Sequence, residues 1–563
     1  MKTTLRHISA SLALILILSL WGCAGIGDRA PYEETEPHFH TFGEWKNARN
    51  SNCTETGMLE RKCTVCGESE TRNTPPLGHI LGDWEKIGST YVKNCTQCGE
   101  KVAVQEIFDT TADEVNYCLS PDRKSYIVLG VKSCKYGVIV IPNEVDGLKV
   151  VRVAENAFKN SKDIDTIILP DTLEEISANA FFGSSIRRIH IPDSVKTIGE
   201  YAFSECKNLE SVILPNSLEY ISPYLFAEST NLSEVYIPEN VGSIPEKAFY
   251  LTGITSVTIP KNATVIGKHA FANCKQLKSV TLHEGILSVG TMAFEKCTSL
   301  EEIHLPESAT QIGEWVFAWC ESLKRASLPS TLTAIPSYTF YGCTSLEAFE
   351  IPNGVKKLGC SCFTGCRSLT EIDLPDGLSA WEFGIFEGCS SLKSIVIPEQ
   401  ITSIDTMTFA YCTSLESIYI PASVRNISTT AFIHTGDNLT NITVAPENSI
   451  YSSDGKTLYL YKKVLLGSAD GSIPKDVTEI YACAFYGRTA LTEIYIPKNI
   501  VKIEGSAFEN CQSVTKITYE GTVAEWKEVE LGMDWFVGSD IDVVHCSDGD
   551  TELVVERSPS MWD

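Results

Sequence analysis

The sequence predicts an α/β-type repeat solenoid dominated by β-structure, and three observations carry this prediction. The phrase LESIYIP at 415–421 recurs along the chain with small changes. A proline or its substitute follows at a step of almost always 23 residues from Pro170 to Pro421, and an AF dipeptide or a variant keeps the same period. We therefore expect a right-handed solenoid with about 23 residues per rung and a parallel β-sheet on its concave face.

Each repeat contains one strand and one return segment. In LESIYIP the leucine and the two isoleucines point inward and Tyr419 points outward, because successive strand residues face opposite sides. Pro421 ends the strand, since proline lacks the donor that would continue the sheet. One short strand per turn cannot close a core, so neighbouring turns have to stack. A period of this length around L-x-x-I-x-I is typical of leucine-rich-repeat solenoids.

A second regularity lies three residues after each repeat phenylalanine. The position is occupied by Cys206, Cys274, Cys297, Cys320, Cys343, Cys366, Cys389, Cys412 and Cys511, and elsewhere by Ser161, Ser184, Ser229, Thr252 and Thr435. Unpaired cysteine packs as a small hydrophobe. Adjacent rungs would lie about 4.8 Å apart, which is wider than the Cβ separation of about 3.8 Å in a disulfide. We expect structural thiols rather than disulfides or a ladder of metal ligands.

The N-terminus carries an export signal. Lys2 and Arg6 precede the apolar run SASLALILILSL, which LWGC follows. Residues 1–22 resemble a bacterial lipoprotein signal, in which Cys23 would receive lipid and become the mature N-terminus; an ordinary cleaved signal peptide is the alternative. Residues 23–37 are small, polar and proline-punctuated, as in a tether. The chain would then be exported and anchored on the outer face of a bacterial membrane.

Residues 38–100 contain an internal duplication. HTFGEW at 40–45 returns as HILGDW at 79–84, and CTVCGE at 63–68 returns as CTQCGE at 95–100. A C-x-x-C-G turn places two thiolates on one side of a loop, and thiolates suit tetrahedral zinc. The unit resembles zinc-ribbon-like modules, and disulfides in an oxidising exterior are the alternative. The candidate ligands are Cys63, Cys66, Cys95 and Cys98, with His40, Cys53 and His79 as possible substitutes.

The repeat itself carries a family resemblance. CTSLESIYIPASVRNISTTAF, at 412–432, resembles the repeat of the BspA-type leucine-rich-repeat surface proteins, because a proline and no asparagine ladder follows the strand. The resemblance covers roughly residues 115 to 547. It divides the chain into an N-terminal cap with the first rung (101–160), repeats (161–444), a hairpin-like insertion (445–474), further repeats (475–518) and a C-terminal cap and tail (519–563).

Charge and motifs exclude several functions. The net charge of -26 opposes binding to nucleic acid or to anionic lipid, so the only expected membrane contact is the lipid anchor. The chain has no P-loop, HExxH or GxSxG motif. His304, Ser327 and Glu350 follow one another on the outward stripe, but the serine lies between the histidine and the acid, so the acid cannot orient the imidazole. We expect no enzyme activity and no cofactor in the solenoid.

The resemblance implies attachment, either adhesion to or recognition of an external protein or glycan through the concave face. Exposed Tyr, Ile and Val on the outward stripe favour contact with a ligand, whereas a structural spacer of the cell envelope would carry small, solvated residues there. Both functions remain open at this point. The candidate ligand-binding residues are Tyr236, Thr258, Thr281, His304, Ser327 and Tyr419.

Overall fold

The computed structural model describes residues 114–132, 134, 137–538 and 541–557, together with six strands nearer the N-terminus. The chain divides into two compact units, residues 1–109 and 110–563. The six strands of the first unit form two antiparallel three-stranded sheets. One sheet contains β1 (Lys46–Arg49), β2 (Gly57–Lys62) and β3 (Ser69–Thr74), and the other contains β4 (Glu85–Ile87), β5 (Thr90–Asn94) and β6 (Lys101–Glu106).

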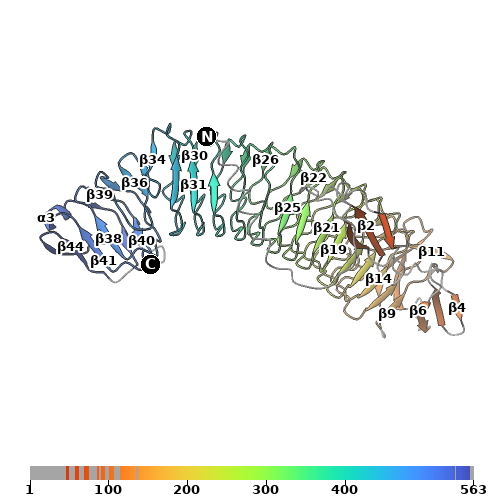
Figure 1. Cartoon of the computed structure of the whole chain (residues 1–563). Coiled ribbons are helices and arrows are strands. Elements are labelled where there is room, and N and C mark those ends of the chain that lie inside the picture. Colours follow the sequence, from red (N-terminus) through yellow and green to blue (C-terminus); the bar gives the residue numbers. More distant parts are fainter. Residues whose placement is uncertain are drawn as a thin grey trace, which may run out of the picture. The chain divides into compact units, whose positions relative to one another are not determined.

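The second unit is a parallel-strand solenoid of about 18 turns with about 23 residues per turn, which confirms the predicted fold class (Figure 1). Helix is almost absent: in the part of the chain that the structure describes, the single helix is α3 (Val523–Trp526), one turn closed by a capping box between Thr522 and Glu525. The L-x-x-I-x-I segments build the first sheet. Its strands pair in parallel and in register, so that Thr166, Arg188 and Ser211 lie side by side.

The strands of this first sheet have three or four residues pointing alternately in and out. They are β9 (Val138–Val140), β12 (Thr166–Ile168), β14 (Arg188–His190), β16 (Ser211–Ile213), β17 (Glu234–Tyr236), β19 (Ser256–Thr258), β21 (Ser279–Thr281), β23 (Glu302–His304), β25 (Arg325–Ser327), β29 (Ser394–Val396), β31 (Ser417–Ile420), β33 (Asn441–Val444), β38 (Glu493–Ile496), β41 (Lys516–Tyr519) and β44 (Val543–Cys546). A lone bridge between Ala348 and Glu371 continues the ladder.

Most turns also contain a second strand, so the prediction of one strand per turn was wrong; the turn of Ser211–Ile213 has no second strand. These strands are mostly two residues long with a single inward side chain, and so they leave no alternating pattern in the sequence. They are β11 (Leu148–Val153), β13 (Glu175–Ile176), β15 (Thr197–Ile198), β18 (Ser243–Ile244), β20 (Val265–Ile266), β22 (Ser288–Val289), β24 (Gln311–Ile312), β26 (Ala334–Ile335), β27 (Lys357–Leu358), β28 (Ala380–Trp381), β30 (Ser403–Ile404), β32 (Asn426–Ile427), β37 (Glu479–Ile480), β39 (Lys502–Ile503) and β42 (Glu530–Leu531).

The AF segments form a third side of each turn, which we call the phenylalanine side. From Phe158 to Phe432 the buried rings stack with centroids 5.1–5.9 Å apart. Backbone bonds join the same segments, as where the N–H of Phe181 donates to the Ala202 carbonyl at 2.8 Å. Residues two before and two after the phenylalanine have a left-handed backbone in most turns, for example Gly342 (φ 71°).

The cysteines of the repeat are free, as predicted, and the nine in the ladder are buried. They also have a role that the sequence analysis missed. Each Sγ donates to the carbonyl oxygen of the phenylalanine in the preceding turn at 3.0–3.3 Å. Ser229 makes the same bond to Phe203 at 2.7 Å. The position therefore selects a small hydrogen-bond donor, and its Ser and Thr substitutes were the signal for this in the sequence.

Two features interrupt or close the stack. Between Phe432 and Phe485, β34 (Tyr451–Ser453), β35 (Leu458–Leu460) and β36 (Lys463–Leu466) form an antiparallel meander, and β36 then pairs in parallel with β37. Antiparallel hairpins lie at the two ends of the solenoid. The remaining strands are β7 (Val115–Leu119), β8 (Tyr126–Val131), β10 (Glu144–Val145), β40 (Phe508–Glu509), β43 (Phe536–Val537) and β45 (Gly549–Glu552).

Candidate binding surface

The candidate site is the outward column of the first sheet, which is the last outward-pointing position of each strand. In β19 and β23 the central residue is buried and both flanking residues are exposed. Because the strands are in register, Thr258 lies beside Thr281 and His304 beside Ser327. Tyr419 belongs to the same column further along, beside Val396. The structure thus places all six predicted residues in one column, five of them on successive turns.

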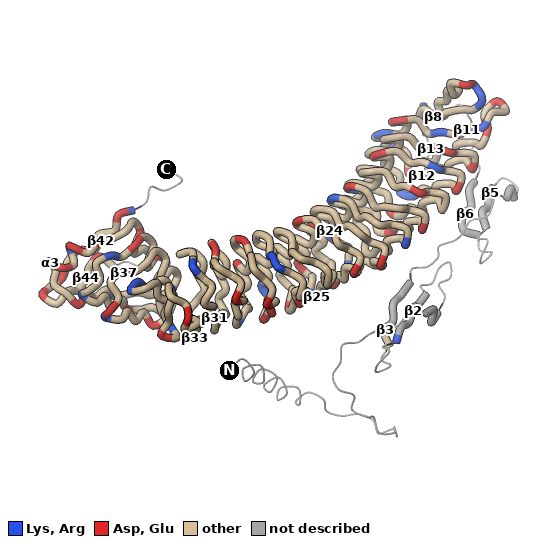
Figure 2. Tube along the Cα trace, turned by 90° about the horizontal axis from the view of Figure 1, so that it is seen from above, with Lys and Arg blue, Asp and Glu red and all other residues tan. Residues whose placement is uncertain are grey.

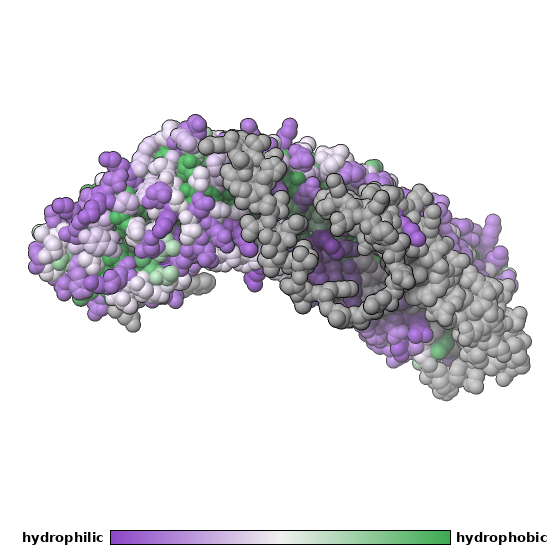
Figure 3. All heavy atoms as spheres, viewed as in Figure 1, coloured by the Kyte–Doolittle hydropathy of each residue, from purple (hydrophilic) through white to green (hydrophobic). Residues whose placement is uncertain are grey.

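This column exposes apolar side chains that a sheet does not need for folding. Tyr236 is 52% exposed, Ile213 50% and Val396 67%. Tyr495 is exposed in the same way. Ile213 lies directly beside Tyr236 and Val396 beside Tyr419, and polar residues such as Thr258 and His304 separate these two pairs. On the face of the molecule drawn in Figure 3, hydrophobic residues form small patches separated by hydrophilic ones. A surface of this kind offers many separate contacts rather than one large apolar patch.

Three of the candidate side chains have polar partners. The Nδ1 atom of His304 lies 2.9 Å from the Ser327 hydroxyl. Glu350 makes no hydrogen bond to either residue in the part of the solenoid that the structure describes, so the order of these three residues does not produce a catalytic triad. Tyr419 donates its hydroxyl to Glu399 at 3.1 Å, and burial together with that carboxylate raises its pKa.

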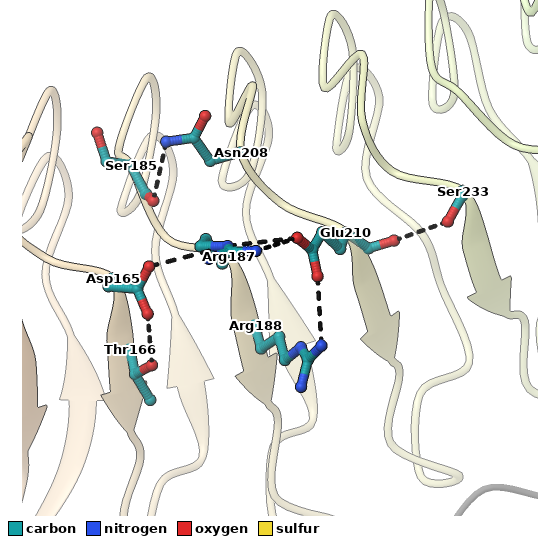
Figure 4. Close-up of polar contacts among 8 residues, drawn as sticks. All are labelled: Asp165, Thr166, Ser185, Arg187, Arg188, Asn208, Glu210 and Ser233. Atoms are coloured by element: carbon teal, nitrogen blue, oxygen red, sulfur yellow. Dashed lines mark hydrogen bonds and ion pairs between the residues drawn. The ribbon is translucent and has the colours of Figure 1, made fainter. Parts of the chain in front are cut away.

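Charged ladders run alongside this column, at the start of the strands (Figure 4). Arg187 donates to Glu210 in the next turn at 2.6 Å, and its Nε atom lies 4.0 Å from Asp165 in the preceding turn. Arg188 reaches the same glutamate at 3.4 Å. The hydrogen bond from Arg187 lowers the pKa of Glu210. Figure 2 shows Lys and Arg interspersed with Asp and Glu along the turns. These opposite charges pair between neighbouring turns and reinforce the register of the strands.

The predicted metal and lipid positions lie outside the described residues. They are Cys23, His40, Cys53, Cys63, Cys66, His79, Cys95 and Cys98. Within the described ranges, no group of three or more His, Cys, Asp and Glu side chains could hold a metal ion. In these same ranges no helix is long and apolar enough to cross a bilayer.

Sequence reasoning missed an aromatic cluster on the phenylalanine side. Trp315 stacks on Tyr338 of the next turn with centroids 3.9 Å apart and lies 5.5 Å from Trp319. Tyr341 meets Trp319 edge-on at 5.2 Å. All four side chains are partly exposed. The signal was present in the sequence as two tryptophans placed symmetrically around Phe317.

The stacked turns, the repeated L-x-x-I-x-I strands and the solvated sheet define a repeat scaffold of the leucine-rich-repeat class, whose members are generally non-enzymatic and generally bind other proteins. A family model described as "BspA type Leucine rich repeat region (6 copies)" matches residues 132–252, 242–347, 333–454 and 468–529. The chain belongs to this family. Its members are typically surface proteins.

Several solved structures are similar to this chain. A leucine-rich repeat protein from Bacteroides ovatus is 27% identical over 60% of this chain and 94% of its own, with a TM-score of 0.41. A leucine-rich cell surface protein from Faecalibacterium prausnitzii is 22% identical over 75% and 97%, with a TM-score of 0.35. The pneumococcal vaccine antigen PcpA is 20% identical over 65% and 95%, with a TM-score of 0.38. No curated protein matches the chain in sequence.

Proposed function

We propose that this chain is a non-enzymatic binding protein of the bacterial cell surface that recognises an external protein through the outward column of its first sheet. The observation that carries the proposal is the series of exposed aromatic and aliphatic side chains in that column, which the core does not use. Each turn contributes a weak contact at a fixed spacing, and contacts of this kind add up along an extended partner.

The partner in this proposal is a protein and not a glycan. Aliphatic Ile213 and Val396 lie directly beside Tyr236 and Tyr419 in the column, and aliphatic side chains match the apolar side chains of a protein surface. Glu350 and Asp373, two and three turns beyond His304 in the column, are exposed, which favours a partner with basic residues. Binding should therefore weaken as salt rises.

The decisive experiment takes a ligand found by screening the mature chain against protein and glycan arrays. The double variant Tyr236→Ala plus His304→Ala should bind that ligand at least about tenfold more weakly at an unchanged melting temperature. Tyr220→Ala is the matched control, because Tyr220 is equally exposed (55%) and lies outside the column. Unchanged affinity of the double variant would place the site elsewhere. A chain that captures no ligand in either array would favour the spacer function.

Attachment through Cys23 completes this proposal and rests on the signal sequence. A lipid-modified chain should fractionate with the membrane and incorporate labelled fatty acid. Cys23→Ser should release the protein and abolish labelling. An equally membrane-bound and identically migrating serine variant would show that Cys23 is not the anchor.

The duplicated module is proposed to bind zinc through Cys63, Cys66, Cys95 and Cys98. The support is the repeated C-x-x-C-G pattern. Metal analysis of the full chain purified under reducing conditions should find one or two zinc ions, which Cys63→Ser plus Cys66→Ser should reduce. Metal-free protein with these thiols oxidised in pairs would support the disulfide alternative.

A further inference from the structure

The aromatic cluster of Trp315, Trp319, Tyr338 and Tyr341 is not a requirement of the fold. Trp315, Trp319 and Tyr338 have left-handed backbones, with φ of 60°, 57° and 60°. Bulky side chains are uncommon in this conformation. The equivalent positions of other turns are occupied by Asn179, Met292, Met407, Leu251 and Gly365, among others. The solenoid therefore accepts many residue types here, and nothing in the backbone selects aromatic rings.

A glycine in the neighbouring turn leaves room for one ring of the cluster. A Cβ atom added to Gly342 would lie 2.8 Å from the Cδ1 atom of Trp319, so the glycine leaves the space that the indole occupies. The rings are not buried by this contact, and all four keep exposed surface. A partly exposed cluster of four aromatic rings, with a glycine that leaves room for one indole, is the arrangement of a contact site.

The charges around the cluster indicate what it contacts. The Lys296 ammonium lies over the Trp319 ring, 4.7 Å from its centroid, so a cation already occupies one ring within the chain. Among the described residues no Lys or Arg covers Trp315, Tyr338 or Tyr341. Glu314, next to Trp315 in sequence, is exposed and has no ion-pair partner within the described ranges. Burial, the Cys360 thiol and then the Glu314 and Glu382 carboxylates raise the pKa of Tyr338, so both carboxylates act on its hydroxyl.

We propose that this cluster is a docking site for an arginine in a basic segment of a partner protein. The guanidinium plane stacks on the exposed surface of the rings that Lys296 does not cover, and Glu314 supplies the counter-charge. The net charge of -26 draws a basic segment toward the chain. This surface lies on the phenylalanine side and not on the first sheet, so it does not depend on the outward column.

The test uses the full chain, a hexa-arginine peptide and isothermal titration calorimetry. In the variant Trp315→Met plus Tyr338→Met, methionine takes the place that Met292 and Met407 occupy in other turns with φ of 57°. The net charge is unchanged, so general attraction to the acidic chain is retained. We expect the variant to bind the peptide about tenfold more weakly. Glu314→Gln changes an exposed side chain and should leave folding unaffected. It should weaken binding of the peptide about threefold.

The matched control is Tyr201→Met plus Tyr224→Met. This pair stacks at 4.6 Å in an earlier pair of turns, but Lys247 already covers Tyr224. The control should bind like the natural chain. Equal affinity of the Trp315/Tyr338 variant and the natural chain, or an equal loss in the control, would overturn the proposal. A second outcome concerns neutral xylohexaose. If only the Trp315/Tyr338 variant loses binding to this sugar, and its affinity for hexa-arginine is unchanged, the cluster is a carbohydrate site. That result would also overturn the proposal.

Discussion

The repeats before the insertion and the repeats after it stack in the same way, but through separate sets of buried residues. Before the insertion the phenylalanine rings form an unbroken stack to Phe432. After it a new stack begins with Phe485 and Phe508, 4.7 Å apart. The buried apolar side chains divide in the same place, into one group that runs from Val115 to Leu466 and another from Val464 to Val544. The insertion therefore separates two cores within one solenoid.

A buried arginine joins these two cores. In the turn of Phe485, the position that elsewhere holds Cys, Ser or Thr is Arg488. Its side chain donates to the Gly467 carbonyl at 2.7 Å and to the Gly436 carbonyl, and lies 4.0 Å from Asp437. Where turns stack directly, a thiol is long enough to reach the preceding turn. Across the insertion only a long side chain with several donors spans the gap.

The largest expected effect is a loss of stability at high pH, which should differ between the regions before and after the insertion. Burial raises the pKa of Cys274 to about 11 and that of Cys320 to about 12. The unfolded thiols ionise from about pH 8.5 and the folded ones do not, so stability is complete below that pH and falls as pH rises toward 11. The loss is about 1 kcal/mol per thiol for each pH unit. Eight of the nine ladder cysteines precede the insertion, so that region should lose the most stability.

Urea titrations at pH 8 and pH 10 under reducing conditions measure this effect. The triple variant Cys343→Ser, Cys366→Ser and Cys389→Ser should lose less stability between the two pH values, because a serine does not ionise. The same pH dependence in the triple variant and the natural chain would show that other groups cause it.

The second prediction breaks the link between the cores. Arg488→Met should destabilise the region after the insertion by about 3 kcal/mol, because Asp437 and two carbonyls then lose a buried donor. We expect that region to unfold first in denaturant, and the fluorescence of Trp526 and Trp535 reports its unfolding. Arg325→Met is the control, since its guanidinium is exposed and lies 3.7 Å from Glu302. A single transition with an unchanged midpoint would mean that Arg488 does not hold the cores together.

The third prediction tests the donor role of the cysteine ladder. Cys343→Ala removes the bond to the Phe317 carbonyl and should cost about 1 kcal/mol, whereas Cys343→Ser keeps a donor and should cost less. Thermal or chemical denaturation of the two variants gives the comparison. The opposite order would show that apolar packing, and not the hydrogen bond, selects cysteine here.

The smallest effect concerns the surface ladder of the regular region. Glu210→Gln removes the partner of Arg187 and should lower the melting temperature by less than about 1 °C, since both charges are exposed. The pKa of Glu210 is lowered, so its contribution is present above its ordinary pKa and is lost as pH falls through the lower folded value. The difference from the natural chain should disappear in 1 M salt, and a difference that persists there would point to a packing role.

Much of the fold and part of the candidate surface could be read from the sequence. The period and the outward column followed from alternation within LESIYIP, because a strand places every second residue on one side. The second sheet could not be found in this way, since Glu175–Ile176 and its equivalents are too short to alternate. The aromatic cluster did not follow from this alternation, because Trp315 and Trp319 lie outside the strands.

The sequence by itself determined the period, the stacking and the class of protein, because leucine, isoleucine and phenylalanine at a fixed spacing can be buried only by neighbouring copies of the same turn. Only the tertiary structure decided which atoms meet between turns. The thiol of Cys343 bonds a carbonyl 26 residues earlier, and Arg488 bonds one 52 residues earlier. Such partners depend on the register of the stacked turns and on the length of the insertion, and neither is a local property of the chain.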